Sequence, residues 1–265
     1  MVKTPQTTQD PLVVVKDLTH RFSEPGRFTS HAALTVLDRL SFALETNDVV
    51  GLMGPSGVGK STLARLLMGL ERPSAGEVTI EGLAPQVWRR ANPGAMAAVF
   101  QDYTSALNPE LTILESLSEP YRLRGCTQTA KGIKDASFPD FESWLEAVGL
   151  SPALLSRYPH ELSGGQCQRA ALVRAVKSDA RLVVFDEALS ALDAVHQTEL
   201  LTFLKAERQR LATEGKSCLW VFISHDPEAI AMIATRLIVL REGHIACDTT
   251  PQAYWSEHLA DAKSL

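Results

Sequence analysis

One continuous apolar run passes directly into a glycine-rich loop and then into a helical pattern, and this succession constrains the fold more than any other feature. The run is VVGLM at 49–53, the loop is GPSGVGKS at 54–61, and the helical pattern STLARLLMGL begins at Ser61. A wholly apolar run is typical of a strand buried on both faces of a parallel sheet. Strand, tight glycine turn and helix in direct succession predict an α/β fold.

The same alternation of apolar runs and helical patterns recurs along the chain. Helices are predicted at 166–177 and about 194–212, each close to a further apolar run. Alternating strands and helices favour a mostly parallel sheet. Glu242-Gly243, between two short apolar segments, predicts a hairpin that makes the sheet mixed. The strands predicted for this sheet, besides 49–53, are 97–100, 181–185 and 218–224.

Two further regions depart from this alternation. Three early segments with β-branched or alternating residues predict a separate antiparallel β layer; they are 12–16, 34–44 and 77–82. Residues 102–177 hold turn signals and helical pieces without a convincing strand, which indicates an inserted helical subdomain.

We therefore expect one domain over 1–265 rather than two, because 265 residues suffice for one large domain. Its core and β layer are predicted at 12–101 and 178–248, and its helical subdomain at 102–177. A short C-terminal tail is predicted at 249–265.

The loop at 54–61 fits G-x-x-x-x-G-K-[ST], a phosphate-binding pattern, in the strand-to-helix context that the pattern requires. Glycines let backbone N–H groups surround a polyphosphate, and the helix N-terminus adds its positive dipole end. Lys60 is expected to reach the β and γ phosphates, and the Ser61 hydroxyl to ligate Mg²⁺. The residues predicted to bind the nucleotide phosphates are Gly54, Pro55, Ser56, Gly57, Val58, Gly59, Lys60, Ser61 and Thr62.

Two carboxylates end the apolar run RLVVFDE at 181–187. In such folds the carboxyl ends of the parallel strands lie at the edge that holds the phosphate loop. Asp186 is expected to hold Mg²⁺, directly or through water, and Glu187 to polarise the attacking water. Acidic residues after a strand are common, so this interpretation depends on Lys60 upstream.

A second candidate anion site is LSGGQ, which runs from Leu162 to Gln166 and precedes a helical pattern. Ser163 is predicted to cap this helix, and Gly164 and Gly165 leave backbone N–H groups free to face an anion. By itself the pattern indicates an ordinary capped helix more often than an anion site.

These motifs, in this order, resemble the ATP-binding subunits of ABC transporters, whose signature is LSGGQ. The resemblance spans about residues 12–248 and implies a P-loop NTPase core that binds ATP and Mg²⁺. It implies that Gln101 senses Mg²⁺ and the membrane subunit, that Asp193 belongs to the D-loop, and that His225 contacts the γ-phosphate. Phe22 occupies the place of the aromatic residue that stacks on adenine, where the family usually has Tyr.

Finer features resemble one importer group, the peptide/nickel/opine family. The extension after Gln101 matches this group, and the 23–34 loop, the short 82–97 linker and Ala188 resemble its nickel or metal–metallophore branch. The resemblance thus implies an ATPase that powers import of nickel or another divalent metal, free or metallophore-bound. An ATPase of a di/oligopeptide importer is the alternative.

The resemblance also implies partners. These are a second ABC ATPase subunit in a heterodimer, two membrane permease subunits and an extracytoplasmic solute-binding protein. The chain is then expected at the cytoplasmic face of the inner membrane, held by the permeases. The segment 102–120 is expected to contact the permease through apolar residues such as Leu107 and Leu111.

Two other classes of protein fit less well. A non-transport ABC ATPase of DNA repair or translation usually carries long coiled coils or two cassettes, and neither is present here. A net charge of −5 gives no basic field for nucleic acid. A regulatory module without turnover is disfavoured because Lys60, Glu187 and His225 are all present.

Overall fold

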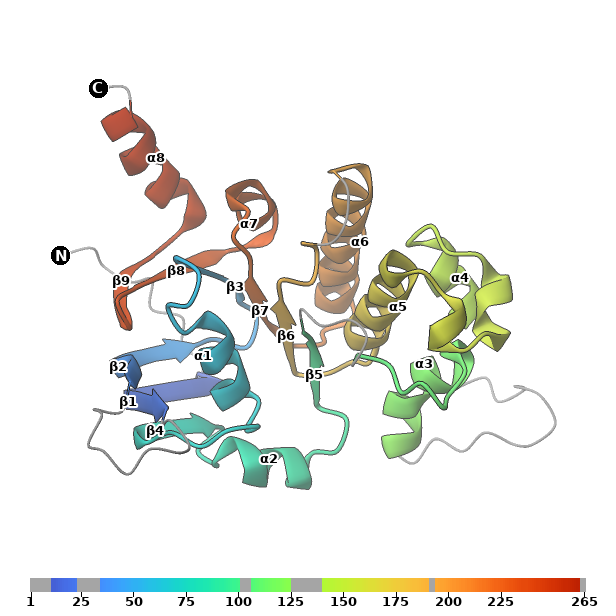
Figure 1. The fold of residues 1–265 in the computed structure, drawn as a ribbon, viewed down its shortest axis with the longest axis horizontal. Coiled ribbons are helices and arrows are strands. Elements are labelled where there is room, and N and C mark those ends of the chain that lie inside the picture. The colour runs from blue at the N-terminus through green and yellow to red at the C-terminus, as the bar shows by residue number, and fades with distance from the viewer. Residues whose placement is uncertain (1–10, 23–33, 101–105, 125–139, 191–193, 263–265) are drawn as a thin grey trace.

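The computed structural model describes residues 11–22, 34–100, 106–124, 140–190 and 194–262 (Figure 1). In Figure 1 the antiparallel strands gather at one end of the molecule and the helices of 106–124 and 140–177 at the other, with a larger sheet between them. This arrangement confirms the predicted fold class, an α/β core with a mixed sheet, an antiparallel β part and helical segments.

The larger sheet has the strand order β5-β6-β7-β3-β8-β9, in which β9 alone runs antiparallel to its neighbour. Strands β6 and β7 are buried at every residue, as their continuous apolar runs predict. The hairpin at Glu242-Gly243 joins the last two strands. The bounds are β3 (Val49–Met53), β5 (Met96–Val99), β6 (Leu182–Asp186), β7 (Leu219–Ile223), β8 (Arg236–Arg241) and β9 (His244–Thr249).

The second sheet is antiparallel with the order β2-β1-β4. Its first strand is longer than the predicted 12–16, because a register shift between Val15 and Leu18, with Asp17 at φ 46°, interrupts the alternating pattern without ending the strand. Leucines of helix α1 (Lys60–Leu67) share one apolar core with strands of both sheets. The bounds are β1 (Val13–Phe22), β2 (Leu34–Leu44) and β4 (Ala75–Ile80).

The described part of the predicted helical region, 106–124 and 140–177, contains helices and no strand. Helix α5 is its centre, because eight of its residues, including Leu172 and Val173, are buried against the neighbouring helices and the larger sheet. The elements are α3 (Ile113–Leu123), α4 (Phe141–Glu146), the 3₁₀ turns η2 (Pro152–Ser156) and η3 (Pro159–Glu161), and α5 (Gly164–Lys177).

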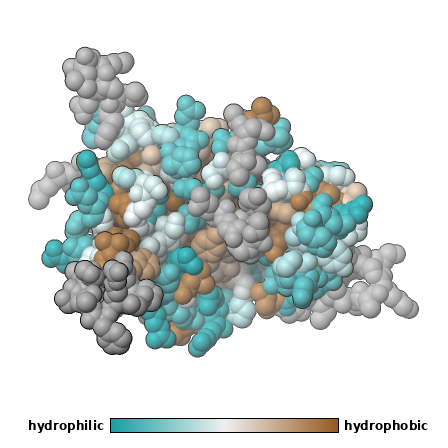
Figure 2. Space-filling model, in the orientation of Figure 1, coloured by the Kyte–Doolittle hydropathy of each residue, from teal (hydrophilic) through white to brown (hydrophobic). Residues whose placement is uncertain are grey.

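The remaining helices include three that the sequence patterns did not predict. One of them, α8, occupies most of the segment predicted as a short C-terminal tail, and α2 occupies the linker 82–97. On the face drawn in Figure 2, hydrophobic residues form separate patches among hydrophilic ones, so the large apolar surfaces lie inside. The bounds are α2 (Pro85–Ala91), α6 (Ala194–Thr213), α7 (Pro227–Ile233) and α8 (Pro251–Ala262).

Within the described residues, every helix is too short or too polar to cross a membrane.

Candidate functional site

The phosphate loop follows β3 and turns into α1 through glycines in left-handed or extended positive-φ conformations. A Cβ on Gly54 would lie 2.4 Å from the Leu240 carbonyl oxygen, and one on Gly59 would lie 2.6 Å from Leu37 Cδ2. Real Cβ atoms do not approach so closely, and φ values of 149° and 105° at these positions favour glycine as well. Both residues therefore have to be glycine for the loop to pass β2 and β8.

Lys60 is the first residue of α1, and its side chain turns back into the loop. Its Nζ donates to the carbonyl oxygens of Gly54 at 2.8 Å and Pro55 at 2.9 Å, and the residue is only 7% exposed. The ammonium group thus sits at the mouth of the helix N-terminus, where backbone N–H groups and the helix dipole attract an anion. This agrees with the predicted contact of Lys60 with phosphate oxygens.

Asp186 ends β6 and lies beside this loop. The residue is 4% exposed, and burial raises the pKa of its carboxyl, while a hydrogen bond with the Ser61 side chain acts to lower that pKa. Within the described residues, its buried Oδ1 has no hydrogen-bond partner. Mg²⁺ prefers oxygen ligands, so an unpartnered carboxylate oxygen beside a hydroxyl fits this cation.

Glu187 follows at once and adopts an unusual backbone conformation, with φ 51°. A left-handed conformation is costly for a non-glycine residue and is found preferentially at functional sites. Its carboxylate Oε1 lies 3.7 Å from Nδ1 of His225, which follows β7. Because β7 neighbours both β6 and β3, the two side chains and the phosphate loop reach the same edge of the sheet.

Most of the phosphate loop, with Glu187 and His225, lines one cavity of about 520 Å³. Phe22, at the end of β1, is 45% exposed and lines the same cavity, with its ring edge-on to His20 at 4.9 Å between centroids. An exposed aromatic ring at the rim of a phosphate site agrees with the predicted stacking on adenine. The cavity is lined by Phe22, Val36, Ser56, Gly57, Gly59, Lys60, Ser61, Thr62, Glu187 and His225.

The LSGGQ segment forms the start of α5 and is closed by a capping box. Ser163 Oγ accepts from the Gln166 backbone N–H at 3.3 Å, and Gln166 Oε1 accepts from the Ser163 N–H at 2.9 Å. The cap was predicted from the sequence, and the reciprocal role of Gln166 was not. None of the residues lining the 520 Å³ cavity comes from 162–166, and Figure 1 shows α5 and α1 on different parts of the molecule.

A family model described as ABC transporter matches residues 37–190, which is more than half of the chain. The chain belongs to the ABC transporter family. The matched range includes the predicted phosphate loop at 54–61, the signature at 162–166 and the carboxylates at 186–187, whereas Phe22 and His225 lie outside it. The roles of the individual site residues remain predictions.

Several relatives of this ABC chain are similar over most of its length. Nickel import ATP-binding protein NikE of Escherichia coli strain 536 is 39% identical over 238 residues, which cover 88% of this chain and 85% of the relative. The protein of the same name from Pseudomonas putida is 38% identical over 239 residues, with 88% and 84% covered.

Solved ABC cassettes share the fold. One is the ATP-binding cassette MJ0796, solved as a dimer in a post-hydrolysis state with ADP and phosphate bound. It is 24% identical, has a TM-score of 0.73, and covers 90% of this chain and 98% of its own. The similarity confirms the α/β cassette architecture of this ABC protein.

Two of the predicted ABC residues, Gln101 and Asp193, lie outside the described residues. Conversely, the structure adds Val36 to the cavity, which the sequence marked only as part of a strand.

The structure also shows the surroundings of Cys167, for which the sequence suggested no role. This buried thiol donates to the Pro159 carbonyl oxygen at 3.2 Å, and burial raises its pKa, so it stays protonated beneath the signature segment.

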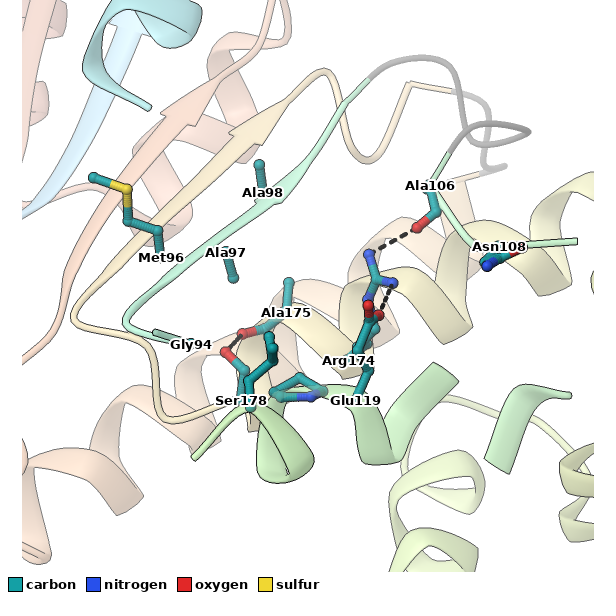
Figure 3. Close-up of a pocket in the computed structure, with 12 residues that line it drawn as sticks. Gly94, Met96, Ala97, Ala98, Ala106, Asn108, Glu119, Arg174, Ala175 and Ser178 are labelled. Carbon is teal, nitrogen blue, oxygen red and sulfur yellow. Dashed lines mark hydrogen bonds and ion pairs between the residues drawn. The ribbon is translucent and has the colours of Figure 1, made fainter. Parts of the chain in front are cut away.

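A second cavity of this ABC chain, of about 430 Å³, lies between β5, α3 and α5 (Figure 3). Arg174 spans it, with Nη2 donating to the Ala106 carbonyl oxygen at 2.7 Å and Nη1 at 3.4 Å from a Glu119 carboxylate oxygen. Leu123, which also lines this cavity, is 58% exposed. The cavity is therefore an open groove that lies between the edge strand β5 and the helices α3 and α5.

Proposed function

We propose that this ABC protein is the ATP-hydrolysing subunit of an importer for nickel or another divalent transition metal, free or bound to a metallophore. The observation that carries the proposal is the 37–39% identity with proteins named nickel import ATP-binding protein over nearly nine-tenths of the chain. Within the described residues, no three His, Cys, Asp or Glu side chains are grouped to hold a metal ion. We propose, as the resemblance to ABC importers implies, that the permeases and the solute-binding protein hold the cargo.

In the proposed reaction four side chains that line the cavity have distinct tasks. The N–H groups at the start of α1 and the Lys60 ammonium bind the phosphates, and Phe22 stacks on adenine. Glu187 accepts a proton from the water that attacks the γ-phosphate, and His225 contacts that phosphate. The 3.7 Å approach of His225 to Glu187 supports this assignment, because both groups then serve the same reacting centre.

Asp186 and Ser61, together with Gln101, are proposed to hold Mg²⁺. The unpartnered Asp186 oxygen is the structural support for this site. The bound cation supplies charge that stabilises the β- and γ-phosphate oxygens. Burial raises the pKa of the Asp186 carboxyl, and a bound cation would favour its charged form.

The separate position of the signature segment supports a two-subunit site. We propose that the N–H groups of Gly164 and Gly165 face the nucleotide bound to a partner ATPase, and that the partner's signature faces the nucleotide bound at Lys60. The capping box leaves the helix end ordered for this contact. A heterodimer of ATPases, two permeases and a solute-binding protein at the cytoplasmic face of the inner membrane completes the proposed complex.

The groove of Figure 3 and the described part of 102–120 are the proposed docking surface for a permease. Leu107, however, cannot provide the contact predicted for it, because the residue is 2% exposed and belongs to the core with Ile113 and Leu117. An apolar residue in a polar stretch fits core and contact alike, which is why the sequence misled here. Leu123 is the better probe, because its side chain is exposed and lines the groove.

Leu123→Glu is expected to reduce the permease that copurifies with this chain from membranes by at least several-fold, since a charge would be desolvated at the contact. ATP affinity should stay unchanged, because Leu123 is not part of the nucleotide cavity. Leu70→Glu is the matched control, at a leucine 49% exposed that lines neither cavity. Normal copurification of Leu123→Glu would place the docking surface elsewhere.

Deleting the gene tests the proposed cargo. Cellular nickel, or cobalt and zinc under metal limitation, should fall when measured by mass spectrometry, while dipeptide uptake stays unchanged. A wild-type copy should restore the metal content, and a Glu187→Gln copy should not. Normal metal content with lost dipeptide uptake would contradict the metal assignment in favour of a peptide importer.

A further inference from the structure

The short segment after Glu187 is held by side chains from three different places. The Glu187 carbonyl oxygen accepts from Ser190 Oγ at 2.9 Å, within the turn itself. The next carbonyl, of Ala188, accepts from Gln168 Nε2 at 2.6 Å. The carbonyl of Leu189 then accepts from Gln197 Nε2 of α6 at 3.0 Å. Three consecutive carbonyl groups are thus fixed directly behind the carboxylate.

Gln168 is the one of these donors that lies on the signature helix. It stands on α5 just beyond the cap formed by Ser163 and Gln166. Eight residues of α5 are buried, so the helix is packed tightly against its neighbours between the Ser163 cap and its C-terminal end. The Gln168 side chain thus connects the Ser163 end of the helix directly to the Ala188 carbonyl.

The environment of Gln168 argues against a purely structural role. The residue is 2% exposed, and its Oε1 is buried with no hydrogen-bond partner in the described residues. A buried unpaired acceptor destabilises the folded state, and an apolar side chain of similar size would avoid that penalty. The glutamine therefore pairs the buried Ala188 carbonyl while its own Oε1 stays unpaired, and that bond positions the segment behind the strained Glu187 backbone.

We propose that Gln168 is a positioning residue that links the signature end of α5 to Glu187 of the same chain. When the Ser163 end engages the partner's nucleotide, Gln168 holds the Ala188 carbonyl so that the Glu187 carboxylate keeps its place beside His225. The inference rests on the proposed role of Glu187 as the general base. Hydrolysis at one site is then sensitive to occupancy of the other.

Gln168→Met removes the donor and keeps the length of the side chain. In the purified transport complex, kcat for ATP is expected to fall at least tenfold, with the Kd for ATP within twofold of wild type and the folded state retained by circular dichroism. Gln86→Met is the matched control, because Gln86 Nε2 likewise donates to a backbone carbonyl, that of Glu71, at 3.0 Å and away from the site. Its kcat should not change.

A second comparison separates positioning from general damage. Combined with Glu187→Gln, Gln168→Met should not lower the residual hydrolysis rate further, because both changes act through one carboxylate. A wild-type kcat in Gln168→Met, or an additive loss in the double variant, would overturn the proposal. So would loss of the folded state in both Gln168→Met and Gln168→Leu, since the residue would then be structural.

The same experiments test the general base separately. Wild-type hydrolysis by Glu187→Gln alone would refute the proposed role of Glu187. Inactive Glu187→Gln beside fully active Gln168→Met would refute only the positioning role.

Discussion

Lys60→Ala is expected to lose most of the ATP affinity of this ABC protein and all of its transport activity. The change removes the ammonium group that faces the phosphate-binding helix end. Each hydrogen bond to a charged phosphate oxygen contributes about 1.5–3 kcal/mol. Loss of two such contacts raises the Kd for ATP on the order of a hundredfold or more, because 1.4 kcal/mol corresponds to about tenfold. Titration with a fluorescent ATP analogue measures the change.

Lys16→Ala is the control for Lys60→Ala. Lys16 is a surface lysine whose side chain is 66% exposed and pairs with Glu77 at 3.3 Å. Exposed pairs of this kind contribute little to stability, so both ATP affinity and transport should persist. Wild-type nucleotide affinity in Lys60→Ala, with the fold intact by circular dichroism, would show that the nucleotide binds elsewhere.

Glu187→Gln is expected to stop hydrolysis while ATP still binds. The amide has the shape of the carboxylate, but it does not take a proton from the attacking water. Loss of a general base lowers the rate by roughly 10²–10⁴-fold. ATP should then accumulate in a stable dimer of ATPase subunits, which size-exclusion chromatography with and without ATP detects.

The control for this variant is Glu228→Gln, an exposed glutamate in the first turn of α7, close behind His225. It changes the same charge near the site and should leave hydrolysis unaltered. Hydrolysis at the wild-type rate in Glu187→Gln would mean that another residue polarises the water.

The sequence predicted those parts of the site in which a functional side chain follows closely after a strand. Lys60, Asp186 and His225 each lie close to the end of a continuous apolar run, and parallel strands present their carboxyl ends at one edge. The sequence did not predict the order of those strands, because β7 pairs with β3, a strand that is distant from it in the chain. Gln101, Asp193 and the subdomain limits remain predictions.

Other features were missed for identifiable physical reasons. Helices α2 and α7 have seven residues each, too few to display a helical period clearly. The fold of α2 depends instead on Trp88, a fully buried side chain whose Nε1 donates to Glu81 Oε2 at 2.8 Å. The sequence did not distinguish Gln168 from the other polar residues of its helix, because its partner, the Ala188 carbonyl, is twenty residues away.

The two carbonyl oxygens that hold Lys60 have a consequence for turnover. A buried ammonium group without a partner would be strongly destabilised, so a site that relied on phosphate alone would resist giving up its products. In this loop the carbonyl oxygens of Gly54 and Pro55 accept hydrogen bonds from the Lys60 ammonium group. The Lys60 ammonium group therefore keeps two hydrogen-bond partners when phosphate leaves. Lys60 can thus bind the nucleotide phosphates tightly and still let the products leave, which repeated ATP hydrolysis requires.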